Sequence, residues 1–216
     1  MTLDKTHAPY QDTATSFIYN LLFCDDIELY KNNNQQVDAY PWNILFSSEV
    51  NVADLRKIIN DPALESRHKI LAYKKLAANG LSTDKKELLS VIVEVGLDNG
   101  LDAIAAYKDG SARYINQTGK MIIWETPDET SNALINDLFA KSENIVAQIG
   151  PWKQPRKPYP CKGMVRTNFL VADELYFGEA PVNVLFNDAL AKPALFSAAA
   201  LMQFLTEKVL SGNTIC

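Results

Sequence analysis

The chain has 216 residues, of which 47% are hydrophobic and 22% charged, a composition within the ordinary range for globular proteins. Its 21 Lys and Arg and 26 Asp and Glu residues give a formal net charge of -5, which disfavours broad binding to nucleic acid or to anionic lipid. A chain of this length buries roughly 70% of the surface that it exposes when unfolded, so its stability requires neither a metal nor a disulfide.

The N-terminal part, residues 1–85, is predicted to be mainly helical. Apolar residues recur with helical spacing in Asp12–Tyr30, which predicts one or two amphipathic helices. The spacing returns in Val52–Ile59 and in Pro62–Asn79, where Asp61 is expected as the N-cap and the proline as the first helical residue. Between these helices, the polar run KNNNQQ predicts a loop, and Ile44–Phe46 is predicted as a short strand.

The middle of the chain has the pattern of an antiparallel meander. Glycine-containing turn signals lie about ten residues apart, as hairpin turns require, at Asp98-Asn99-Gly100, Lys108-Asp109-Gly110 and Gln117-Thr118-Gly119. Four strands are predicted between and beside them: Ser90–Leu97, Leu101–Tyr107, Ser111–Asn116 and Lys120–Glu125. Alternation of apolar residues in the first strand indicates one buried face, which a helix must cover.

Two helices and further strands are predicted in the C-terminal part. Thr126-Pro127-Asp128-Glu129 has the pattern of a capping box, and the helix that it opens should end at Gly150-Pro151. The expected elements after it are strands at Met164–Ala172, Leu175–Phe177 and Val182–Phe186 and a helix at Pro193–Leu210. Runs of strands beside segregated helices predict an α+β domain at residues 86–216, packed with the N-terminal helices into one unit.

The three cysteines, Cys24, Cys161 and Cys216, are far apart in sequence and predict neither a disulfide framework nor a zinc site. The first fifteen residues contain no apolar signal-peptide core, so we expect a cytoplasmic protein. The most apolar stretch, residues 194–210, is interrupted by charged residues and is shorter than the roughly 20 residues that span a bilayer. It is predicted to be a buried helix.

The stretch from Glu94 to Lys120, EVGLDNGLDAIAAYKDGSARYINQTGK, resembles a stretch found in uncharacterised bacterial proteins of similar length. The Asp109-Gly110 turn followed by Arg-Tyr-Ile-Asn carries the resemblance. It is limited to this part of the chain and implies no catalytic residue and no substrate.

Catalytic and metal signals are weak. Glu65 and His68 form a Glu-x-x-His pair, but a di-iron carboxylate site needs a second such pair and two further carboxylates. A solvated helix face is the favoured interpretation. No serine lies in a G-x-S-x-G sequence and no cysteine has an evident base, so we assign no catalytic residue, no metal and no cofactor.

A first binding hypothesis concerns the meander. Tyr107, Arg113, Tyr114 and Asn116 have the chemistry to recognise a small anionic ligand, the guanidinium as a planar donor and the tyrosines as aromatic walls. In an enzymatic version, Glu94 and Asp102 would act as general acid and base.

The favoured structural alternative assigns these residue types to the sheet itself. Asp109 would complete the turn, and Tyr114 would pack with its hydroxyl satisfied. Arg113 would pair with a neighbouring carboxylate, either Glu94 or Glu125.

A second binding hypothesis concerns the loop Pro151–Arg166, which contains four prolines and five cations, with no acidic residue from Asn144 to Ala172. The prolines stiffen it, so it would project a fixed positive patch. Residues expected to dock an acidic partner protein are Trp152, Lys153, Arg156, Lys157 and Tyr159. In the alternative interpretation it is a solvated crossover loop, and Trp152 packs back onto the sheet.

The sequence therefore favours a non-enzymatic binding or protein-interaction module that uses the basic Pro-rich loop. The alternative is a sensor or enzyme with a pocket for a small anionic ligand on the meander. Nucleic acid is disfavoured as a partner because five charges are few beside the roughly 6–10 phosphate contacts of a typical nucleic-acid binder. We expect no membrane association.

Overall fold

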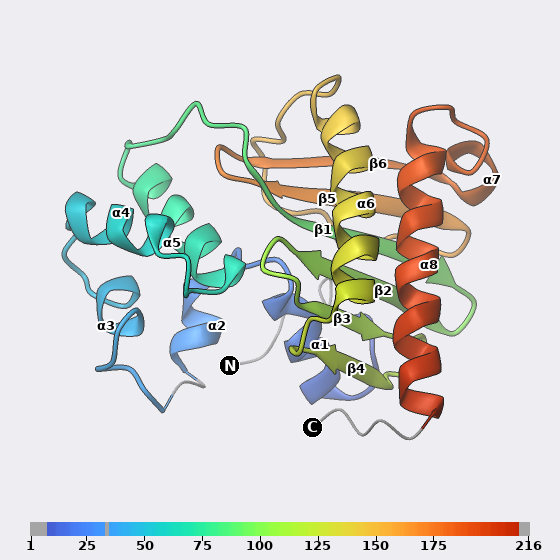
Figure 1. The fold of residues 1–216 in the computed structure, drawn as a ribbon, viewed down its shortest axis with the longest axis horizontal. Coiled ribbons are helices and arrows are strands. Elements are labelled where there is room, and N and C mark those ends of the chain that lie inside the picture. The colour runs from blue at the N-terminus through green and yellow to red at the C-terminus, as the bar shows by residue number, and fades with distance from the viewer. Residues whose placement is uncertain (1–7, 33–34, 212–216) are drawn as a thin grey trace.

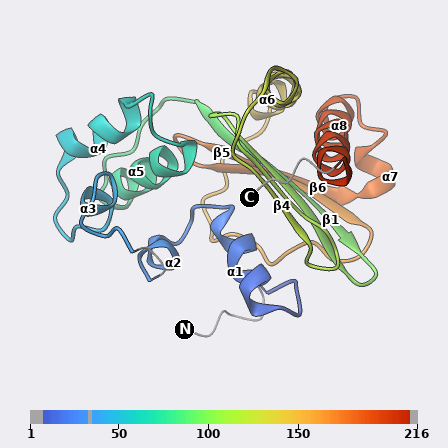
Figure 2. The ribbon, with the colours of Figure 1, turned by 60° about the horizontal axis from the view of Figure 1, so that its bottom comes forward.

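The computed structural model describes residues 8–32 and 35–211, and in these a six-stranded antiparallel sheet lies between two groups of helices (Figures 1 and 2). The strand order is β4-β3-β2-β1-β5-β6. The strands are β1 (Leu88–Leu97), β2 (Gly100–Tyr107), β3 (Ala112–Ile115), β4 (Met121–Trp124), β5 (Met164–Val171) and β6 (Leu175–Pro181). The predicted α+β class and the four-stranded meander are confirmed.

Helices precede the sheet, connect β4 to β5 and follow β6. Their bounds are α1 (Thr13–Leu21), α2 (Ile27–Lys31), α3 (Trp42–Leu45), α4 (Val52–Asn60), α5 (Ser66–Ala78), α6 (Glu129–Val146), α7 (Val182–Leu185) and α8 (Ala191–Leu210). Within the described residues, no helix combines the length and the apolar character needed to cross a membrane.

Each face of the sheet is buried by one group of helices (Figure 2). On one face, α6 and α8 contribute Leu138, Leu201 and Leu205 to a core shared with Val91 and Phe169 of the sheet. Because successive strand residues point to opposite faces, the neighbouring residues belong to the other core.

The second core joins the sheet to the N-terminal helices. Ile92 and Leu101 of the sheet belong to the same apolar cluster as Phe23, Leu55 and Leu71. The helices before β1 and the sheet therefore share one continuous core.

Two predicted strands, Ile44–Phe46 and Val182–Phe186, are wrong. Ile44 and Leu45 lie in α3, where the Lys75 ammonium donates hydrogen bonds to their carbonyl oxygens at 3.1 and 2.9 Å. Strand β6 extends beyond its predicted end at Phe177 and reaches Pro181. The residues after Pro181 form α7. A short apolar run is compatible with a strand and with a buried helical turn, and its periodicity does not distinguish them.

The start of α5 also differs from the prediction. Asp61 accepts a hydrogen bond from the Ala63 amide at 2.9 Å, which closes a turn rather than capping a long helix. The helix begins at Ser66, whose amide donates to the Asp109 carboxylate at 2.5 Å. A residue of the β2–β3 turn thus takes the role of a helix cap and links α5 to the meander.

Asp109 also completes its own turn, as expected from the sequence. Its carboxylate accepts hydrogen bonds from the Ser111 amide at 2.9 Å and from the Ser111 hydroxyl at 2.6 Å. Partial desolvation acts to raise the pKa of Asp109, but the hydrogen bonds from Ser111 and Ser66 outweigh it and hold the pKa below its ordinary value.

We expect Asp109→Asn to lower the free energy of unfolding by about 1 kcal/mol at neutral pH, a modest cost because solvent screens this surface carboxylate. A lowered folded-state pKa contributes stability above the unfolded pKa, about 3.9, and this stability is lost as the pH falls through the folded value. The difference between the two proteins should therefore shrink below about pH 4. Urea unfolding across this pH range measures the difference in the free energy of unfolding. The control variant is Asp84→Asn, at an exposed position. A difference in the free energy of unfolding that does not change with pH would contradict the stabilising role given to the ionised Asp109 carboxylate.

Candidate functional site

The Pro-rich loop, residues 150–163, folds back onto the protein instead of projecting from it. Near its start, the Trp152 amide donates to the Leu175 carbonyl oxygen at 2.7 Å, and the indole ring packs edge-on against Phe177 at 5.1 Å. At its end, the Gly163 amide donates to the Gly96 carbonyl oxygen at 2.9 Å. The loop is therefore fastened to β6 and to β1.

Arg156 fastens the middle of the loop to α1 and the residues after it. Its side chain is 8% exposed. The guanidinium donates to Asp25 at 2.7 Å and to the Asn20 side chain at 2.6 Å, and it lies 3.9 Å from the centre of the Phe23 ring. Arg156 thus points inward, where a partner protein would not reach it.

The other residues of the expected docking patch divide between folded and exposed positions. The Lys157 ammonium lies over the Trp152 and Phe177 rings, at 5.3 and 5.1 Å from their centres. Lys153, Lys157 and Tyr159 are all exposed. The structure does not assemble the five residues into one projecting patch.

Below the loop lies a buried polar cluster centred on Glu94, which has no exposed surface. Its carboxylate accepts hydrogen bonds from the Tyr19 hydroxyl at 2.5 Å and from the Asn168 side chain at 2.7 Å, and it lies 3.7 Å from the Arg166 guanidinium. Arg166 also donates to Glu179 at 2.5 Å and to a carbonyl oxygen of the Pro-rich loop at 3.3 Å. The cluster joins α1, the sheet and the loop.

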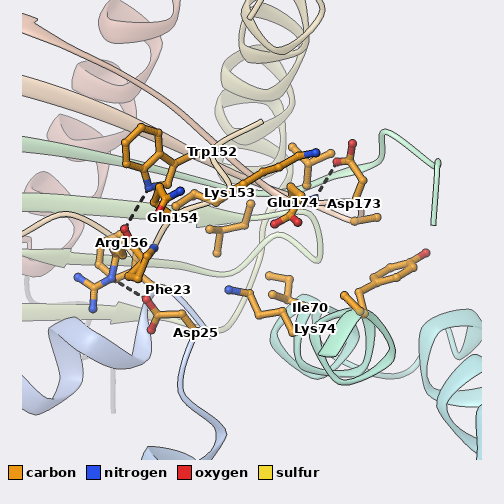
Figure 3. Close-up of a pocket in the computed structure, with 17 residues that line it drawn as sticks. Phe23, Asp25, Ile70, Lys74, Trp152, Lys153, Gln154, Arg156, Asp173 and Glu174 are labelled. Atoms are coloured by element: carbon orange, nitrogen blue, oxygen red, sulfur yellow. Dashed lines mark hydrogen bonds and ion pairs between the residues drawn. The ribbon is translucent and has the colours of Figure 1, made fainter. Parts of the chain in front are cut away.

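A pocket of about 290 Å³ lies between the Pro-rich loop, the end of α1, helix α5 and the β5–β6 turn (Figure 3). Apolar side chains from all four segments line it: Phe23, Ile70, Leu170, Leu175 and the Trp152 ring. The charged side chains of the lining are Asp25, Lys74, Lys153, Arg156, Asp173 and Glu174.

Two cations of this lining have no anionic partner within the described residues. Lys74 extends from α5 toward the space beneath the loop, and Lys153 extends from the loop along the opposite wall (Figure 3). Neither forms an ion pair with a carboxylate of the described part of the chain. By contrast, Asp25 is paired with Arg156. Two ammonium groups are therefore free to bind an anion.

The carboxylates of the β5–β6 turn lie at the other end of the pocket. Asp173 accepts a hydrogen bond from the Tyr176 hydroxyl at 2.7 Å and one from the Glu174 amide at 2.9 Å. The turn is held in shape by these bonds, and its two carboxylates make this end of the pocket acidic.

The four ligand residues predicted on the meander are not brought together. Tyr107 is buried on the α1 face and donates to the Leu22 carbonyl oxygen at 3.0 Å, and Arg113 donates to Glu125 at 2.6 Å. Tyr114 points to the opposite face. Asn116 closes the β3–β4 turn by accepting from the Thr118 amide at 3.0 Å.

The carboxylates considered as an acid–base pair are also separated. Glu94 lies opposite Ala103 in the β1–β2 register, so Asp102, one residue earlier, points to the other face of the sheet. An acid and a base that share one substrate need to lie on the same side.

His68 is buried, whereas the sequence favoured a solvated helix face at Glu65 and His68. Its ring lies edge-on to Trp42 at 4.7 Å, within the apolar contact between α3 and α5. Burial lowers the pKa of His68. The described residues contain no cluster of three or more His, Cys, Asp or Glu side chains suited to a metal ion.

Comparisons with protein-family models, with curated proteins and with solved structures found no match.

Lys74 and the acidic turn were missed because no sequence signal marks them. Lys74 belongs to a run of helix cations that is typical of a solvated surface, and Asp173-Glu174 is a common turn composition. Only the placement of α5 beside the β5–β6 turn brings them to one pocket.

The close packing of the Pro-rich loop on β1 requires glycine at position 96. A Cβ atom there would lie 2.1 Å from the Cys161 carbonyl oxygen and 2.7 Å from that of Pro160. Gly96→Ala should therefore lower the free energy of unfolding by about 1–3 kcal/mol, because backbone must move. The matched control is Gly178→Ala in β6, where the new methyl group meets open space. Urea unfolding compares the free energies of unfolding of the two variants. Equal values would show that the Pro-rich loop does not pack closely against β1 at Gly96.

Proposed function

We propose that the protein is a non-enzymatic binding module whose pocket beneath the Pro-rich loop takes a small organic anion with an apolar body. The observation that carries the proposal is the pair of ammonium groups, Lys74 and Lys153, that face an apolar pocket without a carboxylate partner in the described residues.

The ammonium groups explain the charge of the ligand. Lys74 lies on α5 and Lys153 on the Pro-rich loop, and either ammonium group can pair with a carboxylate or phosphate group of a ligand. Hydrogen bonds to a charged group contribute about 1.5–3 kcal/mol, enough to distinguish an anion from a neutral molecule of the same shape.

The apolar lining and the volume limit its size. Ile70, Leu170 and Leu175 present an aliphatic surface, beside which the Trp152 ring forms an aromatic wall. A volume of about 290 Å³ is near the lower end of the range for ligand pockets, about 300–1,000 Å³. This size fits a monocyclic or amino-acid-sized acid.

The pocket lining favours binding over covalent catalysis. No Ser, Thr, Cys or His is among the residues that line it, so the hydroxyl, thiol and imidazole groups of the Ser–His and Cys–His arrangements do not occur in this pocket. Arg156 and Trp152 are engaged in contacts within the chain, whereas Lys153, Lys157, Tyr159 and Lys162 of the loop are exposed. The cytoplasmic location stays a prediction.

Isothermal titration with phenylacetate, phenyl phosphate and neutral 2-phenylethanol tests the pocket. We expect the anions to bind at least about tenfold more tightly than the alcohol, because each tenfold step corresponds to about 1.4 kcal/mol. Lys74→Gln should abolish this preference. Lys69→Gln removes the same charge from the same helix outside the pocket and should leave it intact.

Two outcomes would contradict the proposal. One is equal binding of the anions and the alcohol by the wild-type protein. The other is an equal loss of affinity for the anions in Lys69→Gln and Lys74→Gln. In that case Lys74 would act only through long-range electrostatic attraction, which added salt screens, and not through direct contact with the ligand.

A further inference from the structure

A second cavity, of about 210 Å³, lies on the other face of the sheet, between α8 and strands β1, β2 and β3. Apolar side chains form most of it: Val93, Ile104, Phe186, Leu195, Ala198 and Met202. Val93, Ile104 and Leu195 belong to the core that α6 and α8 share with the sheet. The cavity is partly open to solvent beside the exposed Ala199, and it is separate from the pocket beneath the Pro-rich loop.

The polar side chains of this cavity are Asp102 of β2 and Tyr114 of β3; Tyr114 lies opposite Ile104, two residues after Asp102 on the same face. The Tyr114 hydroxyl donates to one carboxylate oxygen of Asp102 at 3.1 Å, and the Gln117 amide donates to the other at 2.6 Å. These bonds orient the carboxylate without neutralising it. Within residues 8–32 and 35–211, no Lys, Arg or His forms an ion pair with Asp102.

A carboxylate beside an apolar cavity selects a cation. Each carboxylate oxygen accepts more than one hydrogen bond, so Asp102 retains acceptor capacity after binding Tyr114 and Gln117. The Tyr114 and Phe186 rings also line the cavity, and aromatic faces attract ammonium groups. We propose that this cavity binds a small primary amine with an apolar body, its ammonium group on Asp102 and its body between α8 and the sheet.

The volume agrees with a single ring. An engineered apolar cavity of about 150 Å³ binds benzene, so about 210 Å³ accommodates one ring and a short aminoalkyl chain. The site differs from the proposed anion pocket in its face of the sheet and in the sign of its charge. Either site can be absent without affecting the argument for the other.

The test compares benzylamine, benzyl alcohol and toluene, which share a ring and differ in the polar group. Binding to the full chain is followed by isothermal titration and by ligand-observed NMR. We expect benzylamine to bind at least about tenfold more tightly than benzyl alcohol, the effect of one hydrogen bond to a charged group. Asp102→Asn keeps the shape of the side chain and should abolish this preference, while toluene binds as before.

A second variant pair locates the ring. Ala199 lines the cavity, so Ala199→Leu should weaken all three ligands at least about tenfold by filling it, an effect of about 1.4 kcal/mol. Ala200 is its exposed neighbour outside this cavity, and Ala200→Leu should have no effect. Lys74→Gln, in the other pocket, should leave benzylamine binding unchanged.

Equal affinities for benzylamine and benzyl alcohol, or an amine preference that persists in Asp102→Asn, would overturn the proposal. So would full binding by Ala199→Leu, because the amine would then occupy another place. Circular dichroism and urea unfolding of each variant establish that a loss of binding is not a loss of the fold.

Discussion

The burial of one carboxylate, Glu94, constrains the rest of this structure. A carboxylate with no exposed surface is costly unless several donors surround it. Tyr19 of α1 and Asn168 of β5 supply hydrogen bonds, and Arg166 supplies charge. Burial raises the pKa of Glu94, although these three partners act in the opposite direction. The carboxylate lies on β1 and its donors lie on α1 and β5. These three segments must therefore pack together for the hydrogen bonds to Glu94 to form.

The same cluster determines where the Pro-rich loop lies. Arg166 donates hydrogen bonds to the Glu179 carboxylate and to a carbonyl oxygen of the loop. Arg156, in the loop, donates to the carboxylate of Asp25, which follows α1 in the chain. The loop is thus held by two guanidinium groups that also complete the buried interior. These contacts help to form the pocket, whose walls come from segments that are far apart in sequence.

Local signals predicted the local structure. The meander follows from its glycine turns. The helix after it was predicted from a capping box at Thr126-Pro127-Asp128-Glu129, but the structure forms the box two residues later, with Asp128 as the N-cap and Ser131 as its partner. The errors lie where long-range contacts decide. The apolar run at Ile44 is helical because Lys75, from another helix, binds its carbonyl oxygens. Helix α5 starts at Ser66 because a distant turn supplies its cap. Neither partner is visible within a short window of sequence.

The candidate pocket was less predictable because charge counting does not show which cations point inward. The sequence analysis singled out the segment Pro151–Arg166 but treated its arginines and lysines alike. In the structure, Arg156 and Arg166 are buried and paired, whereas Lys153 remains exposed at the pocket. This division has a physical basis, since a planar guanidinium holds several partners at once and is more weakly hydrated than an ammonium. The two arginines therefore attach the segment to the protein, whereas Lys153 forms no ion pair within the described residues.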